Sequence, residues 1–192
     1  MKPEIPMIKH VIGTKYNDLS PEAIEKTKIF LLATIGCSIA GTSGPSAKEI
    51  LSTAKAWGAA KSSRVWGTHK ALPHTSAAIV NAYQIHCLEF DCVHESGVLH
   101  PMSTLIGATL TEIDRQQHEG KKVTGKEFIQ AIILGIDVSC SIAKSSNAPN
   151  SITTIKSYEP LTMSMLCIVP PTAFVSCSTT AFLSLVGSFK NP

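Results

Sequence analysis

The fold class is decided by residues 20–41, which read SPEAIEKTKIFLLATIGCSIAG. Ser20 is a favourable N-cap and Pro21 suits the first position of a helix, so a helix is predicted to begin here. No charged residue occurs from 29 to 40, which predicts that the helix is buried on most of its sides. Gly41 is expected to end it as a left-handed cap.

The segments on the C-terminal side repeat this helical pattern. Apolar residues at 47, 50, 51 and 54 form one helical stripe, and the alanine-rich stretch 75–90 favours a second helix. Pro101 is suited to begin a third, and the capping box of Thr124 and Glu127 precedes a fourth. Residues 64–67 are too short for more than an extended connector, and no alternating strand pattern competes. The sequence predicts an all-α fold.

Composition limits the possible partners and compartment. The chain has 192 residues, of which 44% are hydrophobic and 16% charged, with a net charge of +3. Its lysines are scattered, so nucleic acid is not expected as a partner. The six cysteines contain no C-x-x-C pair, and the N-terminus lacks the pattern of a secretory signal. We therefore expect reduced thiols and an intracellular, cytoplasmic protein, with a mitochondrial location left open.

Three regions are expected along the chain: an N-terminal segment at 1–18, a helical domain at 19–150 and a divergent, irregular tail at 151–192. Within the tail, residues 161–189 carry no charge and are long enough to span a bilayer. The pair Pro170-Pro171 and the dense hydroxyl side chains disfavour a membrane span. A poorly packed or partner-dependent tail is therefore preferred, and a membrane-tethered helical protein is the weaker alternative.

Chemistry is concentrated between His86 and Pro101. This stretch holds three acids and three histidines in a chain that is otherwise sparing with both, and a glycine and a proline mark a loop between two apolar helices. Loops positioned by a rigid scaffold are common places for catalytic groups. The acids are Glu89, Asp91 and Glu95, and the histidines are His86, His94 and His100.

His100 is the most informative of these residues because it directly precedes Pro101 and therefore stands at a helix N-terminus. The positive end of the helix disfavours a protonated imidazole, which leaves a neutral base. Free backbone N–H groups in the first turn, around Ser103, offer a site for an anionic ligand. This combination suits proton abstraction next to a carboxylate.

Each of these residues also has a simpler interpretation. Glu89 and Asp91 fit a solvent-facing helix end, and His86 fits a hydrogen-bonded neighbour of Glu89. A divalent metal ion held by Asp91, His94 and Glu95 is a further alternative.

Several short motifs resemble those of the MmgE/PrpD family. The run from Leu88 to Glu95 together with Leu99-His100-Pro101 is similar to the D-F-D-D-x-H…HP signature of that family. The helix at 33–41 resembles its D-x-x-G-C-x-x-A-G motif. Further similar stretches are Val65-Trp66-Gly67-Thr68 with Leu72-Pro73, the helix at 77–81, and Gly125-Lys126-Glu127-Phe128 with Ala131 and Gly135.

The resemblance implies the N-terminal part of a large helical domain in a lyase or isomerase. Such enzymes are dehydratases, decarboxylases or epimerases of di- and tricarboxylic acids. They are usually homodimers and need no metal or organic cofactor. On this basis His100, Glu89 and Asp91 are predicted to be catalytic, and His94 and Ser103 to bind the substrate.

Two departures from the family pattern are visible in the signature. Glu89 replaces the usual aspartate, and Cys92 stands where the family commonly has a third acid. The family's later histidine, lysine and tyrosine motifs and its lid domain have no counterpart in the chain. A truncated form is therefore expected, either a lyase or isomerase or an inactive helical fragment that associates with itself or with a full-length relative.

Overall fold

The computed structural model describes residues 4–146, and these residues form an all-helical domain with one small hairpin. The tail predicted at 151–192 and its uncharged part at 161–189 lie outside the described residues. In chain order the elements are α1 (Glu4–Gly13), the 3-10 helix η1 (Tyr16–Asp18), α2 (Pro21–Gly41), α3 (Ala47–Lys55), β1 (Ser63–Val65), β2 (Lys70–Leu72), α4 (His74–His86), α5 (Pro101–His118) and α6 (Gly125–Ser146). The predicted all-α class is confirmed.

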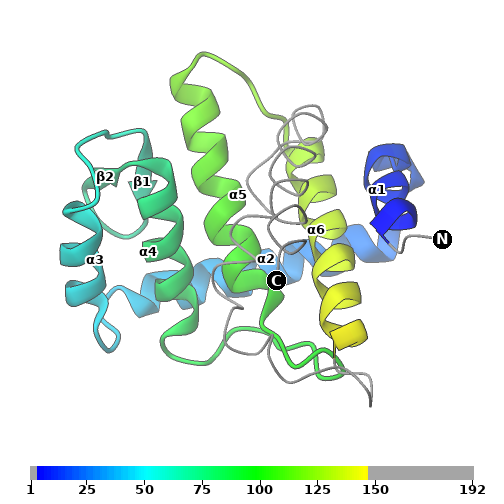
Figure 1. Ribbon diagram of the computed structural model, residues 1–192, viewed down its shortest axis with the longest axis horizontal. Helices are drawn as coiled ribbons and strands as arrows, with labels where there is room; N and C mark the ends of the chain where they lie inside the picture. The colour runs from blue at the N-terminus through cyan, green and yellow to red at the C-terminus, as the bar shows by residue number, and fades with distance from the viewer. Residues whose placement is uncertain (1–3, 147–192) are drawn as a thin grey trace, which may run out of the picture.

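Helix α5 lies at the centre of the domain, between α4 and α6, and α2 crosses behind them (Figure 1). Ile85 of α4, Met102 and Ile106 of α5 and Ile132 of α6 form one fully buried cluster. Burying side chains of this size stabilises the fold by about 1.5–3 kcal/mol each. The core therefore lies directly beside the loop that joins α4 to α5.

Smaller apolar clusters attach the outer elements to this centre. On one side α3, the hairpin and α4 share a core around Ala54, Val65 and Val80. On the other side α1 packs its Val11 against Leu134 and Val138 of α6. The segment before residue 19 thus contributes a helix to the packed domain.

The helix starts lie where the sequence predicts them, because local hydrogen bonds determine them. The Ser20 hydroxyl accepts a hydrogen bond from the Ala23 amide at 3.1 Å at the start of α2. At the start of α6, the Glu127 carboxylate accepts a bond from the Thr124 amide at 2.7 Å. The amide of Glu127 donates in return to the Thr124 hydroxyl at 3.3 Å, which completes the predicted capping box.

The burial predicted for α2 is wrong. Its buried residues are the small or polar Thr27, Thr34, Ser38 and Gly41, whereas Leu32 is 76% exposed. Lack of charge on the helix therefore does not mean burial on all sides. The large apolar residues on its exposed side are Ile29, Phe30, Leu32, Ile35 and Ile39.

Gly41 does not form the expected left-handed cap either. It is the last residue of α2, and Thr42 caps the helix in a right-handed conformation. A Cβ at position 41 would lie 1.8 Å from the backbone oxygen of Gln84 in α4. Gly41 is thus required for the close crossing of two helices.

The connector predicted at 64–67 is instead part of an antiparallel hairpin, in which Arg64 pairs with Ala71. The backbone N–H and C=O groups on its outer edge are hydrogen-bonded to side chains from α4 and α5. The buried Asn81 accepts from the Trp66 amide and donates to the Arg64 carbonyl, both at 3.0 Å, and Asp114 accepts from the Arg64 amide at 3.0 Å. Strands this short leave no periodic signal, which explains why the sequence does not reveal them.

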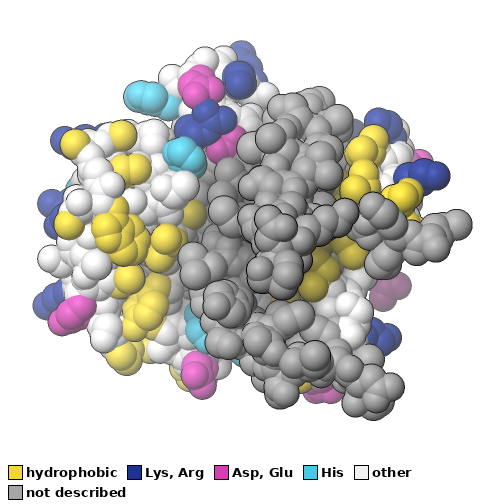
Figure 2. All heavy atoms as spheres, viewed as in Figure 1, with side chains coloured by type: hydrophobic (Ala, Val, Ile, Leu, Met, Phe, Trp, Pro, Cys, Tyr) yellow, Lys and Arg dark blue, Asp and Glu magenta, His cyan; other side chains and the backbone are white. Residues whose placement is uncertain are grey.

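Among the described residues, one helix is long and apolar enough to cross a membrane by length and composition, namely Gly125–Ser145 within α6. Its inner face supplies Ile132 to the central cluster. On the face of the molecule drawn in Figure 2, apolar side chains gather on the side where α3 and α4 lie, and Lys and Arg side chains are spread around the edge. The described surface on that face shows no continuous basic strip.

Candidate active site

The loop between α4 and α5 differs from the prediction in where it begins. Helix α4 ends at His86, so Glu89 and Asp91 lie in an irregular loop instead of on a helix end. Glu89 and Val98 in this loop have φ values of 53° and 50°. Non-glycine residues in the left-handed region cost energy, and such strain often occurs at functional sites.

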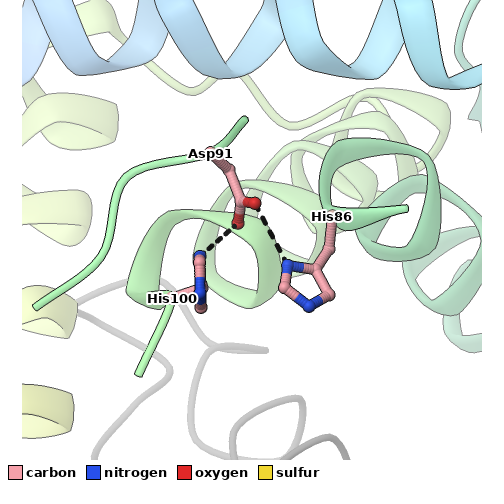
Figure 3. Close-up of side chains that lie close together, drawn as sticks. All are labelled: His86, Asp91 and His100. Carbon is pink, nitrogen blue, oxygen red and sulfur yellow. Dashed lines mark hydrogen bonds and ion pairs between the residues drawn. The ribbon is translucent and has the colours of Figure 1, made fainter. Parts of the chain in front are cut away.

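The loop brings Asp91 between two histidine rings (Figure 3). The Asp91 Oδ1 atom lies 3.1 Å from Nδ1 of His86, and its Oδ2 atom lies 3.3 Å from Nδ1 of His100. The two rings meet edge to face, with their centroids 4.6 Å apart. His86 comes from the end of α4 and His100 from the start of α5, so the cluster depends on how these helices pack.

The cluster is asymmetric in its burial. The Asp91 side chain is 0% exposed, whereas 46% of the His86 side chain and 32% of the His100 side chain are exposed. A buried carboxylate is costly unless hydrogen bonds or opposite charges compensate it. The arrangement therefore holds two accessible imidazoles against one buried acid.

The thiols near Asp91 do not supply this compensation. Burial, with a smaller contribution from the Asp91 charge, raises the pKa of Cys37. Burial also raises the pKa of Cys87 and Cys92, and the charge of Asp91 adds to the effect. These groups consequently remain uncharged thiols at neutral pH.

His100 occupies the N-cap position of α5, as its place before Pro101 predicts. Its side chain makes no capping hydrogen bond, and so the ring is free to face Asp91. The buried Ser103 donates its hydroxyl hydrogen to the His100 carbonyl at 2.9 Å. Ser103 thus fixes the backbone of His100, and its hydroxyl is already engaged.

The structure does not bring the other predicted residues into this cluster. Glu89 is exposed at the outer part of the loop. The backbone of His94 forms an isolated antiparallel β-bridge with Leu99, and the Nδ1 atom of His94 accepts a hydrogen bond from the Gly97 amide at 3.0 Å. His94 also lines a cavity of about 520 Å³ with residues of α1 and α6, among them His10 and Lys144.

The metal-ligand set considered from the sequence also differs from the set that the fold assembles. Residues His86, Asp91 and His100 each place a ligand atom within 4.8 Å of those of the other two. His94 and Glu95 are not in this set. Sequence reasoning missed the role of His86 because Glu89, three residues away, was its expected neighbour. The bend after α4 instead brings Asp91, five positions away, into contact with His86.

A helical domain with a buried carboxylate between two accessible imidazoles carries groups that can donate and accept protons, as acid–base enzymes do. A sequence profile of the MmgE/PrpD N-terminal domain matches residues 7–163, and the chain belongs to the MmgE/PrpD family.

Similar proteins include cis-aconitate decarboxylases. The one from Mus musculus is 30% identical over 132 residues, covering 66% of this chain and 26% of the relative. The one from Homo sapiens has the same identity and coverage. The one from Aspergillus terreus is 25% identical over 128 residues, covering 67% of this chain and 26% of the relative. The chain thus spans about a quarter of the length of these relatives.

Proposed function

We propose that this chain is part of a lyase that acts on a di- or tricarboxylic acid by acid–base chemistry at His100. The observation that carries the proposal is the Asp91 carboxylate, fully buried between His86 and His100 at 3.1 and 3.3 Å. Family membership and the similarity to cis-aconitate decarboxylases support the substrate class.

In this proposal Asp91 orients the His100 imidazole for proton transfer to or from the substrate. A carboxylate held against one ring nitrogen fixes the imidazole and leaves the other nitrogen to exchange a proton with a substrate. His100 is 32% exposed, so its second nitrogen is within reach of a ligand. His86 shares the same carboxylate and modulates how strongly Asp91 interacts with His100.

For a substrate such as cis-aconitate, the proposed step is a decarboxylation with a shift of the double bond. The bond between the methylene carbon and its carboxylate breaks, and that electron pair forms the new carbon–carbon double bond. The electrons of the old double bond take a proton from the His100 imidazolium at the alkene CH carbon. Carbon dioxide leaves, and His100 regains its proton from water. A dehydratase or epimerase would use His100 as a base at a carbon next to a carboxylate.

Substrate binding is proposed to use the start of α5 and the loop residue His94. The helix dipole attracts a carboxylate to the N-terminus of α5. The Ser103 hydroxyl already donates to the His100 carbonyl. We therefore propose that Ser103 supports the backbone of His100, and that the helix dipole attracts the substrate carboxylate. His94 accepts at Nδ1 from Gly97, and a neutral His94 therefore carries its proton on Nε2, where it can donate to a carboxylate.

The test is turnover by the purified 192-residue chain, followed by NMR of the substrate and by release of carbon dioxide. Cis-aconitate, 2-methylcitrate and iminodisuccinate distinguish decarboxylation, dehydration and epimerisation. We expect His100→Ala to lower kcat by roughly 10²- to 10⁴-fold, the usual contribution of a general acid or base. His118→Ala, an exposed histidine at the far end of α5, is the matched control and should retain activity.

Equal activity of the two variants would remove His100 from the mechanism. A folded wild-type chain that turns over none of the three substrates would contradict the lyase proposal and support the second candidate.

The second candidate is a non-catalytic helical chain that associates with a second copy of itself. The exposed apolar residues of α2 favour it, because Ile29, Leu32 and Ile39 recur at helical spacing around Gly36. A Cβ at Gly36 would have no atom of the described part of the chain within 4 Å. An apolar seam of this kind, with a small residue in it, lets another helix approach closely.

A further inference from the structure

The Asp91 carboxylate is incompletely compensated. Its side chain is 0% exposed, and Oδ1 is hydrogen-bonded to His86. Oδ2 is buried and has no hydrogen-bond partner among the described residues, and the facing Nδ1 of His100 is in the same situation, although the two atoms are 3.3 Å apart. The two buried atoms thus form an ion pair at 3.3 Å without the geometry of a hydrogen bond, so each of them is only partly satisfied.

A cation between these atoms would compensate both. Among the described residues the ion-pair partners of Asp91 are His86 and His100, and neither is a permanent cation. The compensating positive charge is therefore either a proton on an imidazole or a bound metal ion. The donor atoms are two imidazole nitrogens and one carboxylate oxygen, a set that suits Zn²⁺ and similar transition metals better than Mg²⁺ or Ca²⁺.

We infer that His86, Asp91 and His100 form a binding site for a divalent transition-metal ion of the Zn²⁺ class. Their three ligand atoms lie within 4.8 Å of one another. In tetrahedral coordination, bonds of about 2.0–2.2 Å place two ligand atoms roughly 3.3–3.6 Å apart, so a pair at the 4.8 Å limit must approach by roughly 1.2–1.5 Å. Both histidine rings are partly exposed, and their rotation towards Asp91 supplies this approach. Three protein ligands leave a coordination position open towards the solvent.

Metal binding and acid–base chemistry exclude each other at this site. A metal ion occupies the Nδ1 lone pair of His100 and takes the Asp91 carboxylate that would orient the imidazole for proton transfer. The ion therefore acts as an inhibitor of the proposed lyase. The inference stands on the geometry alone and does not require the lyase reaction.

The experiment is a calorimetric titration of the full chain with Zn²⁺, in metal-free buffer and without substrate. We expect one site per chain, with affinity weakened by roughly 10- to 100-fold or more in Asp91→Asn and His86→Gln, because each removes one ligand. His94→Ala and His118→Ala are the controls and should bind as the wild type does. Circular dichroism establishes that each variant is folded.

A second measurement on the unmodified chain covers the case in which a variant does not fold. Zn²⁺ should protect His86 and His100 from carbethoxylation, detected by mass spectrometry, and should leave His69 and His118 reactive. The Co²⁺ form should show the visible bands of nitrogen and oxygen ligation without a sulfur charge-transfer band, which distinguishes this site from one at Cys92.

Three results would overturn the inference: wild-type affinity in Asp91→Asn, equal protection of all four histidines, or a sulfur charge-transfer band. Zn²⁺ binding without any turnover would leave this site standing and contradict only the lyase.

Discussion

At the scale of single residues, the charged groups of α5 show how burial and pairing compete. Burial of Glu112 by itself raises its pKa, but hydrogen bonds from Arg115 and Gln116 together outweigh it, and the pKa is lowered. The bonds measure 2.7 Å from Arg115 Nη2 and 2.9 Å from Gln116 Nε2, both to Glu112 Oε1. Ionised Glu112 therefore stabilises the folded chain.

The Glu112→Gln variant should unfold at a lower temperature than the wild type at pH 7. A lowered pKa contributes stability above the ordinary glutamate value of about 4.3, and this contribution disappears as the pH falls through the folded-state pKa. The expected loss is about 1–3 kcal/mol at pH 7, the range of a hydrogen bond to a charged group, and it should shrink as the pH falls through the folded-state pKa. Thermal unfolding at several pH values measures it.

The exposed Glu49→Gln on α3 is the matched control and should change the unfolding temperature little at any pH. A Glu112→Gln difference that stays constant from pH 7 to pH 3 would show that shape, and not charge, is responsible.

At the scale of elements, the crossing of α2 and α4 depends on one glycine. Gly41 lies against the backbone of Gln84, whereas a Cβ at Gly36, inside the same helix, would have no atom of residues 4–146 within 4 Å. Gly36 lies inside α2, and Gly41 is its last residue. Alanine at position 36 therefore tests mainly helix propensity, and alanine at position 41 tests mainly the packing of α2 on α4.

Gly41→Ala should destabilise the domain by about 3 kcal/mol or more, because the two helices must separate. Gly36→Ala should stabilise it by up to about 1 kcal/mol through helix propensity. Denaturant unfolding, at concentrations where the chain is monomeric, gives both values. Equal effects of the two substitutions would contradict the packing role of Gly41.

At the scale of the whole molecule, the exposed side of α2 carries large apolar residues that no other described element covers. Leu32 is 76% exposed and Ile39 is 59% exposed, on a helix whose opposite side is the packed one. Contiguous exposed apolar surface commonly marks an interaction site. The self-association proposed above is therefore testable at this surface.

Leu32→Lys should shift the chain from dimer to monomer in sedimentation velocity. The folded protomer should lose less than about 0.5 kcal/mol, because the side chain is a surface residue of the protomer. Ser52→Lys on the exposed side of α3 is the control and should leave the dimer intact. A wild-type chain that is monomeric at every concentration, or a Leu32→Lys chain that still dimerises, would contradict self-association through α2.

Much of the fold was predictable because its signals are local. Ser20 with Pro21, Pro101 with the preceding His100, and Thr124 with Glu127 determine helix starts through contacts within three or four residues. The hairpin was not predictable, because its edge groups are satisfied by Asn81 and Asp114 of distant helices.

For the candidate site, the sequence by itself placed Asp91 in the chemically rich stretch from 86 to 101, at the expected end of a helix, and His100 at the start of the next helix. Only the tertiary structure decided that His86, and not Glu89, joins them, because the chain bends after α4 and the packing of α4 on α5 brings the two rings to the same carboxylate. It likewise decided that α2 exposes its apolar residues. Local hydrogen bonds determine where a helix begins, whereas the contacts of a side chain depend on elements that are far apart in the chain.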